Sequence, residues 1–553
     1  MSKLVPAGAA LVLALLPTTV PVVAADTIPL NATLAKNPFA YIPPQCWTVT
    51  QQTPASTARN PCYACHVDAP EPNFARDAAL QTAYDFAETI TENPWTNLFA
   101  DRREQIGAVS DSDILDYVRH DNYRAPDGSI ILDAALDKVP AAWDVNADGS
   151  WSGYRPDVYF NFDADGFDHA PDGTPTGWRA YAYKPLPGAF WPTNGSADDV
   201  AIRLPPAFRE RADGTPDLAV YKLNLAILEA LIKRKDVPIA PTDEVALGVD
   251  LDRDGTLGTA RKVTFAYDPL NGVNMDWVGR ARAGQEAGTA HLAALLFPEG
   301  TEFVHSVRYL DVAKDGAVVA APRLKELRYA RKTGWQTYGG LRLQAQRELI
   351  EAGRNPDDPE HFFGDIESGM SNGKAWRLQG FIEDAEGALR PQTYEESLTC
   401  MGCHGAIGRN VDSTISFGRK LDDDGAGSSW YRWSAERPLG ALADADGEYA
   451  RYLKENGAAD EFRANVEALA RFLGEDGSLD SSRVETLSQS VAPLTDPSAE
   501  RALALDKAYR LIVEEQSYNK GRLPVLAPLD KAVHKSVEPG QPTGIETPIT
   551  AMP

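Results

Sequence analysis

The sequence predicts an α+β fold in which two mainly helical, loop-rich regions flank a β-rich middle region, with a helical part near the C-terminus. Apolar and polar residues alternate in residues 302–312, which is typical of a half-buried strand. Apolar residues recur at helical spacing in residues 223–232 and close on basic residues at 233–235. The 40 prolines and 43 glycines indicate long structured loops.

The N-terminal residues are expected to form a secretory signal peptide. Lys3 is the only charged residue before Asp26, and residues 7–16 form a short apolar run. Small residues precede the expected cleavage point at residues 24–25. Because a membrane span needs ~20 apolar residues, no integral membrane segment is expected after cleavage. The protein is therefore expected in the periplasm, secreted or at the cell surface.

The length and charge of the chain limit its organisation and its partners. A chain of 553 residues is too long for one hydrophobic core, so several regions are expected. The net charge of -25 would repel nucleic-acid phosphates and anionic lipids, which argues against both as partners. The expected regions are a signal peptide (1–25), an N-terminal region (26–135), a β-rich middle (136–320), a second loop-rich region (321–440), a helical part (441–537) and a loose tail (538–553).

The remaining elements follow the same two periodicities. Further strands are expected from the strand-like runs at residues 245–249 and 262–267. Residues 462–473 carry an apolar helical face that ends at Gly474, and Asp496 with Pro497 is expected to open another helix. The middle region is therefore predicted as mainly β and the last quarter as mainly helical.

Two short cysteine motifs carry most of the chemical information. Residues 62–66 and 400–404 both have the pattern Cys-x-x-Cys-His, and they contain four of the five cysteines. This spacing is the attachment signature of c-type haem, in which two thiols form thioethers and the histidine binds iron. Thr393 and Glu396 form a capping-box pattern just before the second motif, which predicts that this motif lies on the first turns of a helix.

Three other interpretations of the cysteines compete with haem attachment. Structural disulfides are one, but between cysteines so close in sequence they are usually strained. A thioredoxin-like redox pair needs a strand–turn–helix setting and does not require the following histidine. A zinc site could use Cys46, Cys62 and Cys65 with His66, but it would leave the second motif unexplained. Cys46 itself is expected to be a buried thiol beside Trp47.

On these motifs and the export signal, the chain resembles exported dihaem c-type cytochromes. The resemblance implies two covalent haems held by Cys62, Cys65, Cys400 and Cys403, with His66 and His404 as proximal iron ligands. It implies electron transfer between donor and acceptor proteins. The alternative is a dihaem oxidoreductase, peroxidase-like or oxidising a small molecule, with one open-coordinate haem. A third interpretation is a calcium-stabilised binding protein with structural or sensory haems.

The second axial ligand of each iron is a separate question. No methionine lies between Met1 and Met275, so the first motif lacks a local methionine ligand. His120, at the end of a predicted helix, is the candidate there. His305 on the predicted strand and Met370 in a loop are candidates for the second motif.

Three aspartate-rich segments resemble calcium loops, with oxygen ligands at alternate positions before a glycine. They begin at Asp144, Asn161 and Asp250. The twelfth position, which should carry a bidentate Glu, holds an arginine in the first and third segments, Arg155 and Arg261. The residues expected to bind calcium are Asn161, Asp163, Asp165 and Asp172 in the second segment and Asp250, Asp252 and Asp254 in the third. The segment at Asp144 ranks below them.

Overall fold

The computed structural model describes residues 28–68, 71–181, 191–405, 411–414, 443–444, 447–458, 460, 462–474 and 476–550. The expected signal peptide at residues 1–25 lies outside the described residues. Among the described residues, no helix is long and apolar enough to cross a membrane.

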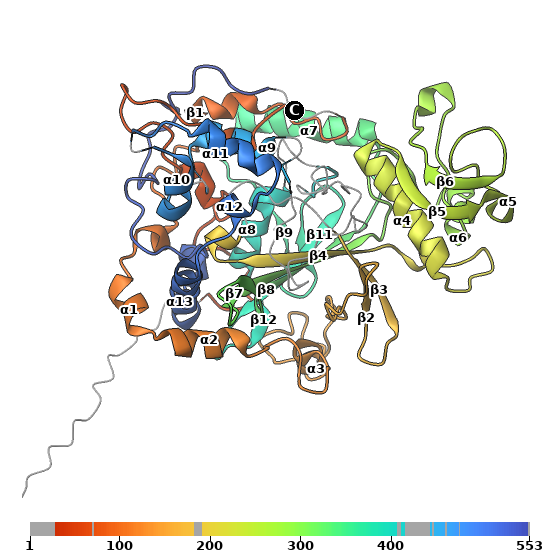
Figure 1. Ribbon diagram of the computed structural model, residues 1–553, viewed down its shortest axis with the longest axis horizontal. Helices are drawn as coiled ribbons and strands as arrows, with labels where there is room; N and C mark the ends of the chain where they lie inside the picture. The colour runs from red at the N-terminus through yellow and green to blue at the C-terminus, as the bar shows by residue number, and fades with distance from the viewer. Residues whose placement is uncertain are drawn as a thin grey trace, which may run out of the picture.

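A large antiparallel sheet forms the centre of the described chain (Figure 1). Its nine strands run in the order β2 (Phe167–His169), β3 (Pro175–Ala180), β4 (Ala197–Arg203), β7 (Glu302–Val312), β8 (Val318–Lys332), β11 (Trp376–Glu383), β10 (Gly369–Ser371) and β9 (Phe363–Asp365), with β12 (Leu389–Pro391) on β11. The strand predicted at residues 302–312 is confirmed with the same bounds. The sheet spans the boundary expected at residue 320, because β8 crosses it.

Helices lie around this sheet, which confirms the α+β class. Their bounds are α1 (Arg103–Ala108), α2 (Asp111–Arg119), α3 (Ile131–Leu136), α4 (Leu218–Lys233), α5 (Glu244–Leu247), α6 (Arg280–Glu286), α7 (Tyr338–Arg354), α8 (Tyr394–His404), α9 (Glu448–Asn456), α10 (Val466–Phe472), α11 (Ser481–Glu485), α12 (Ala492–Thr495) and α13 (Ala499–Glu515). The helix predicted around residues 223–232 is α4, and its side chains are buried almost all round. The helix expected to open at Asp496 is α13, which begins after the cap Ser498.

A lobe projects from one end of the molecule beyond α4 (Figure 1). It contains α5, α6 and a two-stranded sheet of β5 (Val237–Asp243) and β6 (Thr259–Val263). The strand predicted at residues 245–249 is wrong, because α5 occupies its first part. The reason is local: the Asp243 carboxylate accepts hydrogen bonds from the backbone N–H groups of Val245 and Ala246 and so caps a helix. The strand expected at 262–267 overlaps β6 only at its start.

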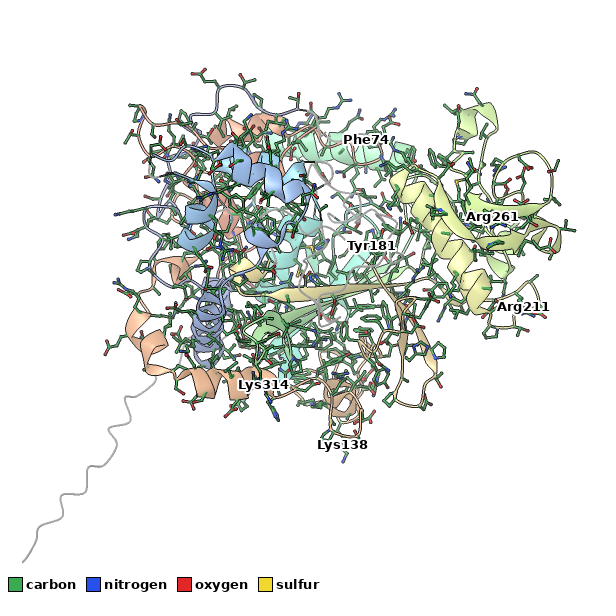
Figure 2. The ribbon with its side chains drawn as sticks, viewed as in Figure 1. Phe74, Lys138, Tyr181, Arg211, Arg261 and Lys314 are labelled. Atoms are coloured by element: carbon green, nitrogen blue, oxygen red, sulfur yellow. The ribbon has the colours of Figure 1, made fainter. Side chains whose placement is uncertain are left out.

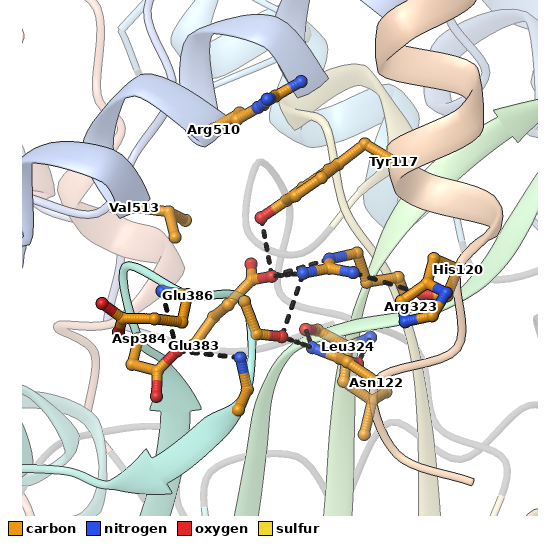
Figure 3. A network of polar contacts seen from close by, with 12 residues as sticks. Tyr117, His120, Asn122, Arg323, Leu324, Glu383, Asp384, Glu386, Arg510 and Val513 are labelled. Carbon is orange, nitrogen blue, oxygen red and sulfur yellow. Dashed lines mark hydrogen bonds and ion pairs between the residues drawn. The ribbon is translucent and has the colours of Figure 1, made fainter. Parts of the chain in front are cut away.

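A buried polar network joins the sheet to α2 (Figure 3). The hydroxyl groups of Tyr117 and Tyr309 each donate to the Glu383 carboxylate at 2.7 Å, and Arg323 donates to it at 2.6 Å. Burial raises the pKa of Glu383, and the Arg323 guanidinium acts against that rise. A buried Glu383 carboxylate is tolerated because its three donors replace the hydrogen bonds that water would make to it.

Both ends of the described chain pack onto the body. The strand β13 (Gln541–Pro542) pairs with β1 (Ala83–Tyr84). Thr543 is 1% exposed, and its hydroxyl donates to the carbonyl of Gln81 at 2.6 Å. Residues 538–550 are therefore not a loose tail. Residues 551–553 lie outside the described residues.

The N-terminal segment 36–47 runs along α8. The Glu395 carboxylate in the first turn of α8 accepts hydrogen bonds from the backbone N–H groups of Lys36 and Asn37 at 2.6 and 3.2 Å. Further along, Gly402 lies so close to the segment that a β-carbon there would be 2.8 Å from the ring of Pro43. This contact places residues 41–43 against the second cysteine motif.

Candidate metal-binding sites

The second cysteine motif occupies the last turns of α8. The helix begins at a capping box in which the Thr393 hydroxyl accepts from the N–H of Glu396 and the Glu396 carboxylate accepts from the N–H of Thr393. The capped helix is therefore confirmed, but the motif lies on its last turns and not, as expected, on its first turns. Cys400 and Cys403 are separated by about one turn, and His404 is the last helical residue.

The imidazole of His404 has defined neighbours. Burial lowers the pKa of His404 to about 4, and the Arg328 guanidinium adds to this effect. A hydrogen bond from the imidazole to the backbone carbonyl of Ser413 acts in the opposite direction. The backbone carbonyl of His404 accepts from the Asn372 side chain at 2.9 Å. Both the backbone and the ring of this residue are thus held by hydrogen bonds.

The first cysteine motif begins in a 3-10 turn, η2 (Cys62–Ala64). His66 follows it, and its Nδ1 lies 2.9 Å from the Asp77 carboxylate. The side-chain amide of Gln81 donates to the carbonyl of His66. A histidine that binds a metal commonly donates its other ring N–H to a carboxylate or a backbone carbonyl. His66 with Asp77 and His404 with Ser413 both have that arrangement.

The two motifs lie near each other in space and share Cys46 as a neighbour. Cys46 lies in η1 (Pro44–Trp47), at the end of the segment that packs along α8. Burial raises the pKa of Cys46 to about 12, and the nearby thiols of Cys62 and Cys403 raise it further. Burial also raises the pKa of Cys62 to about 12. These thiols stay protonated near neutral pH unless a metal or a modification replaces the proton.

The structure places the three candidate axial ligands differently. His120 follows α2 on the surface, where its carbonyl accepts from Arg323 (Figure 3). Met370 is 1% exposed in β10 and belongs to the core, as does Met401 of the second motif. His305 lies on β7, where its Nε2 is 2.8 Å from Asp198, and its charge affects the pKa of His404. Of the three, His305 lies close enough to a motif histidine to interact with it electrostatically.

Oxygen ligands converge in the third aspartate-rich segment, on the projecting lobe. Ligand atoms of Glu244, Asp250 and Asp252 all lie within 4.8 Å of one another. Among the described residues, no other group of three or more His, Cys, Asp or Glu side chains has ligand atoms this close together. Glu244 is 1% exposed, and the Oδ1 atom of Asp250 is buried without a hydrogen-bond partner.

The loop itself is shaped by hydrogen bonds to these carboxylates. Glu244 accepts from the N–H groups of Leu251 and Gly258 at 2.6 and 2.8 Å, and Asp250 accepts from that of Gly255 at 3.1 Å. Asp254, expected among the ligands, instead accepts from the backbone and hydroxyl of Thr256, both at 2.8 Å. Arg261, at the twelfth position, is exposed on β6 (Figure 2).

The second aspartate-rich segment has other partners. The Lys222 ammonium lies 2.6 Å from Asp165 and supplies a positive charge there. Asp172 is exposed and accepts from the N–H of Thr174. The backbone N–H of Asn161 donates to Asp168, while the Asp163 carboxylate accepts from the N–H of Phe167. The structure does not bring the four expected ligands of this segment together.

The first segment repeats the hydrogen bonds of the third. Asp144 accepts from the N–H of Gly149 at 2.8 Å. A buried glutamate from a distant part of the chain, Glu367, accepts from the N–H groups of Val145 and Ser152 at 3.2 and 2.7 Å. These are the second and ninth residues of the segment, as Leu251 and Gly258 are in the third segment.

Sequence reasoning missed Asp77, Glu244 and Glu367. Glu244 precedes its loop, whereas calcium-loop patterns look for the closing glutamate after it. The sequence feature that could have revealed Glu244 is the acidic pair Asp243–Glu244, directly before the strand predicted at residues 245–249. Glu367 is far from Asp144 in the chain, so no sequence pattern could connect them.

Comparisons with known proteins give the family context. A family described as lipoprotein-like matches residues 30–488. A protein of Aquifex aeolicus (strain VF5), described as an uncharacterized lipoprotein, is 33% identical over 535 residues, which cover 88% of this chain and 86% of the relative. No solved structure matches. A lipoprotein family suggests an exported protein, which agrees with the expected export.

These matches correct the interpretation of the cysteine motifs. Neither description names a cytochrome or haem. The dihaem c-type cytochrome, its electron-transport function, the alternative dihaem oxidoreductase and the two covalent haems were therefore wrong predictions. The physical reason is that a five-residue motif fixes the order of two thiols and an imidazole, but not the group that they hold. The match extends over most of the sequence rather than two short motifs, and it shows that the chain belongs to the lipoprotein-like family.

Proposed function

We propose that this protein is an exported protein, periplasmic or at the cell surface, that binds a divalent cation of the calcium type on its projecting lobe. The observation that supports this most is the convergence of Glu244, Asp250 and Asp252 within 4.8 Å. Ionised carboxylates at such distances repel one another, and a cation between them removes that repulsion.

The chemistry of the three side chains favours a hard cation. Ca²⁺ takes six to eight oxygen ligands at about 2.3–2.6 Å and accepts irregular geometry, whereas Mg²⁺ requires a near-ideal octahedron. Glu244 approaches from the helix before the loop and takes the place of the closing glutamate that Arg261 cannot provide. The Oδ1 atom of Asp250, which has no hydrogen-bond partner, remains available to a cation.

The proposed consequence is a more stable lobe. The loop from Asp250 to Gly258 connects α5 to β6, so a cation bound there holds the two elements together. A cation that binds only the folded state stabilises that state in proportion to RT ln(1 + [L]/Kd). At a free concentration of about 100 times Kd, the gain is about 2.7 kcal/mol.

Calorimetric titration of the metal-free protein with CaCl2 tests this proposal. We expect saturable binding, a Kd raised at least about tenfold in both Glu244→Gln and Asp250→Asn, and weaker binding of Mg²⁺. Asp165→Asn is the matched control, because Lys222 already neutralises that carboxylate, and it should leave the Kd unchanged. Absence of binding heat together with an unchanged melting temperature in Ca²⁺ would overturn the proposal.

A second candidate function concerns the two cysteine motifs. We infer that His66 and His404, with the thiols of Cys62, Cys65, Cys400 and Cys403, bind transition-metal ions. The specific observation is that each imidazole has an acceptor at one ring nitrogen, Asp77 or the carbonyl of Ser413, which leaves the other nitrogen for a metal. Thiol and imidazole ligands suit copper, zinc and iron.

Elemental analysis and intact mass together test this second function. The native protein is expected to contain iron, copper or zinc, and the variants His66→Ala and His404→Ala should each lower the content. The denatured chain should have the mass of its polypeptide. An adduct that survives denaturation would show that the cysteines hold a covalent group and would overturn binding of a bare ion.

A further inference from the structure

We propose that the buried pair of Lys332 and Asp412 is a positioning device that presents His404 to a transition-metal ion. The proposal rests on the second candidate function and deepens it, because it names the residues that fix the metal-binding imidazole. Neither residue belongs to a cysteine motif. Both act through the turn at residues 411–414.

The turn has an unusual backbone. Asp412 and Ser413 have φ angles of 50° and 60°, in the left-handed region that residues with a β-carbon rarely adopt. Such a conformation persists only where its surroundings impose it. The backbone of Ser413 in this turn is hydrogen-bonded to the imidazole of His404.

The surroundings that impose this turn are the end of β8 and the chain beside it. The Lys332 ammonium lies 2.5 Å from the Asp412 carboxylate, with the side chains 1% and 3% exposed. The same carboxylate accepts from the backbone N–H of Phe297 at 2.9 Å. Lys332 and the N–H of Phe297 thus hold the side chain of Asp412 from two directions, and this also restrains the backbone of Asp412.

The position of His404 leaves its ring in need of a restraint from outside the helix. It is the last residue of α8, and Gly405 after it caps the helix, so no further helical turn restricts its ring. The side chain of Asn372, the residue after β10, donates to its backbone carbonyl. The turn supplies the remaining restraint, a fixed acceptor for one ring nitrogen. The other nitrogen then has a single direction in which to meet a metal.

The rest of the neighbourhood suits a metal ion. His305, whose Nε2 is held by Asp198 at 2.8 Å, lies close enough to influence His404 electrostatically. Arg328 lies close enough to the thiols of Cys400 and Cys403 to interact with them electrostatically. An ion that accepts imidazole and thiolate together is of the iron, copper or zinc type.

Anaerobic titration with Co²⁺ tests the proposal, because its visible spectrum reports the ligands. The experiment uses the full chain with His66→Ala, so that one motif remains, and excess Ca²⁺ to fill oxygen sites. Asp412→Asn keeps the shape of the side chain but removes its charge. We expect it to weaken Co²⁺ binding 10- to 100-fold, the usual effect of losing an outer partner, and to change the spectrum. Lys332→Arg, which keeps the charge, should retain binding.

Control variants separate positioning from general stability. Asp460 is also a buried aspartate, 3% exposed, and accepts from the N–H of Ala464. Asp460→Asn should lower the melting temperature without changing the Co²⁺ affinity. If Asp412→Asn does not fold, Lys332→Gln tests the same ion pair between Lys332 and Asp412. An Asp412→Asn protein with the parental affinity and spectrum would overturn the positioning role.

A last comparison distinguishes this proposal from the function on which it rests. In the same background, His404→Ala should abolish the Co²⁺ spectrum. If His404→Ala binds Co²⁺ as before, the metal site itself is wrong. If it loses binding while Asp412→Asn does not, only the positioning device is wrong.

Discussion

Gly402, inside the second motif, lies directly against residues 41–43 of the N-terminal segment. A β-carbon there would meet the carbonyl of Tyr41 and lie 2.8 Å from the Pro43 ring. The backbone of residues 41–43 cannot rotate away as a flexible side chain would. The glycine inside this motif therefore serves close packing rather than an unusual turn.

We expect Gly402→Ala to destabilise the protein by about 1–3 kcal/mol, the usual cost of overpacking. The gain from placing alanine in a helix, about 0.5–1 kcal/mol, is smaller. Urea denaturation measures the difference. Gly107, in α1, has no atom within 4 Å of an added β-carbon. Gly107→Ala should therefore be neutral or stabilising, and an equal loss in both variants would contradict the packing argument.

At the scale of elements, the contact between α13 and the sheet carries buried charges. Asp506 on α13 and Lys325 on β8 are both 0% exposed, with 3.9 Å between their nearest charged atoms. The Oδ2 atom of Asp506 has no hydrogen-bond partner. Burial raises the pKa of Asp506 to about 8 and lowers that of Lys325 to about 8.

The pH dependence of stability follows from the raised pKa of Asp506. A carboxyl whose pKa is raised on folding binds its proton more tightly in the folded state. Its contribution to the free energy of unfolding is therefore greatest below pH 4 and is lost as the pH rises to about 8. The lowered pKa of Lys325 acts above this range, where stability falls as the pH drops from 10.5 towards 8.

We expect Asp506→Asn to flatten the dependence of stability on pH between 5 and 8 and to gain relative to the parent at pH 8. Denaturant unfolding at several pH values measures this. Asp116 is an exposed aspartate of α2, and Asp116→Asn should leave the pH profile unchanged. A parental slope in Asp506→Asn would contradict the role given to this carboxyl.

At the scale of the whole molecule, residues 541–543 pack against residues 50 and 82–84, far away in the sequence. The pairing of β13 with β1 is accompanied by the hydroxyl of Thr50, which donates to the carbonyl of Thr543 at 2.7 Å. The backbone N–H of Thr543 donates to Thr82. These contacts join residues near 50 and 80 to residues near 540.

We expect a chain ending at residue 539 to lose at least about 1 kcal/mol of stability, since buried polar groups would lose their partners. Hydrogen exchange at Ala83 and Tyr84 should become faster. A chain ending at residue 550 keeps β13 and is the matched control. Equal exchange in both truncated chains would show that the C-terminal pairing does not hold the N-terminal region.

Local patterns in the sequence were reliable where neighbouring residues decide the structure. The capping box at Thr393 and Glu396, the strand at residues 302–312 and the long apolar helix α4 were all predicted. Prediction failed at residues 245–249, where a short apolar run favoured a strand but the Asp243 cap formed α5. The capping carboxylate outweighs a short apolar pattern because it satisfies two backbone donors directly.

The sequence by itself determined which groups this protein has for chemistry: two Cys-x-x-Cys-His motifs, aspartate-rich loops and a strong negative charge. Only the tertiary structure decided which of them meet. Glu244 joins Asp250 and Asp252, Lys222 neutralises Asp165, and the segment 36–47 brings Cys46 to the motifs. The physical reason is range: caps and periodicities act over a few residues, whereas a binding site depends on where packing places distant segments.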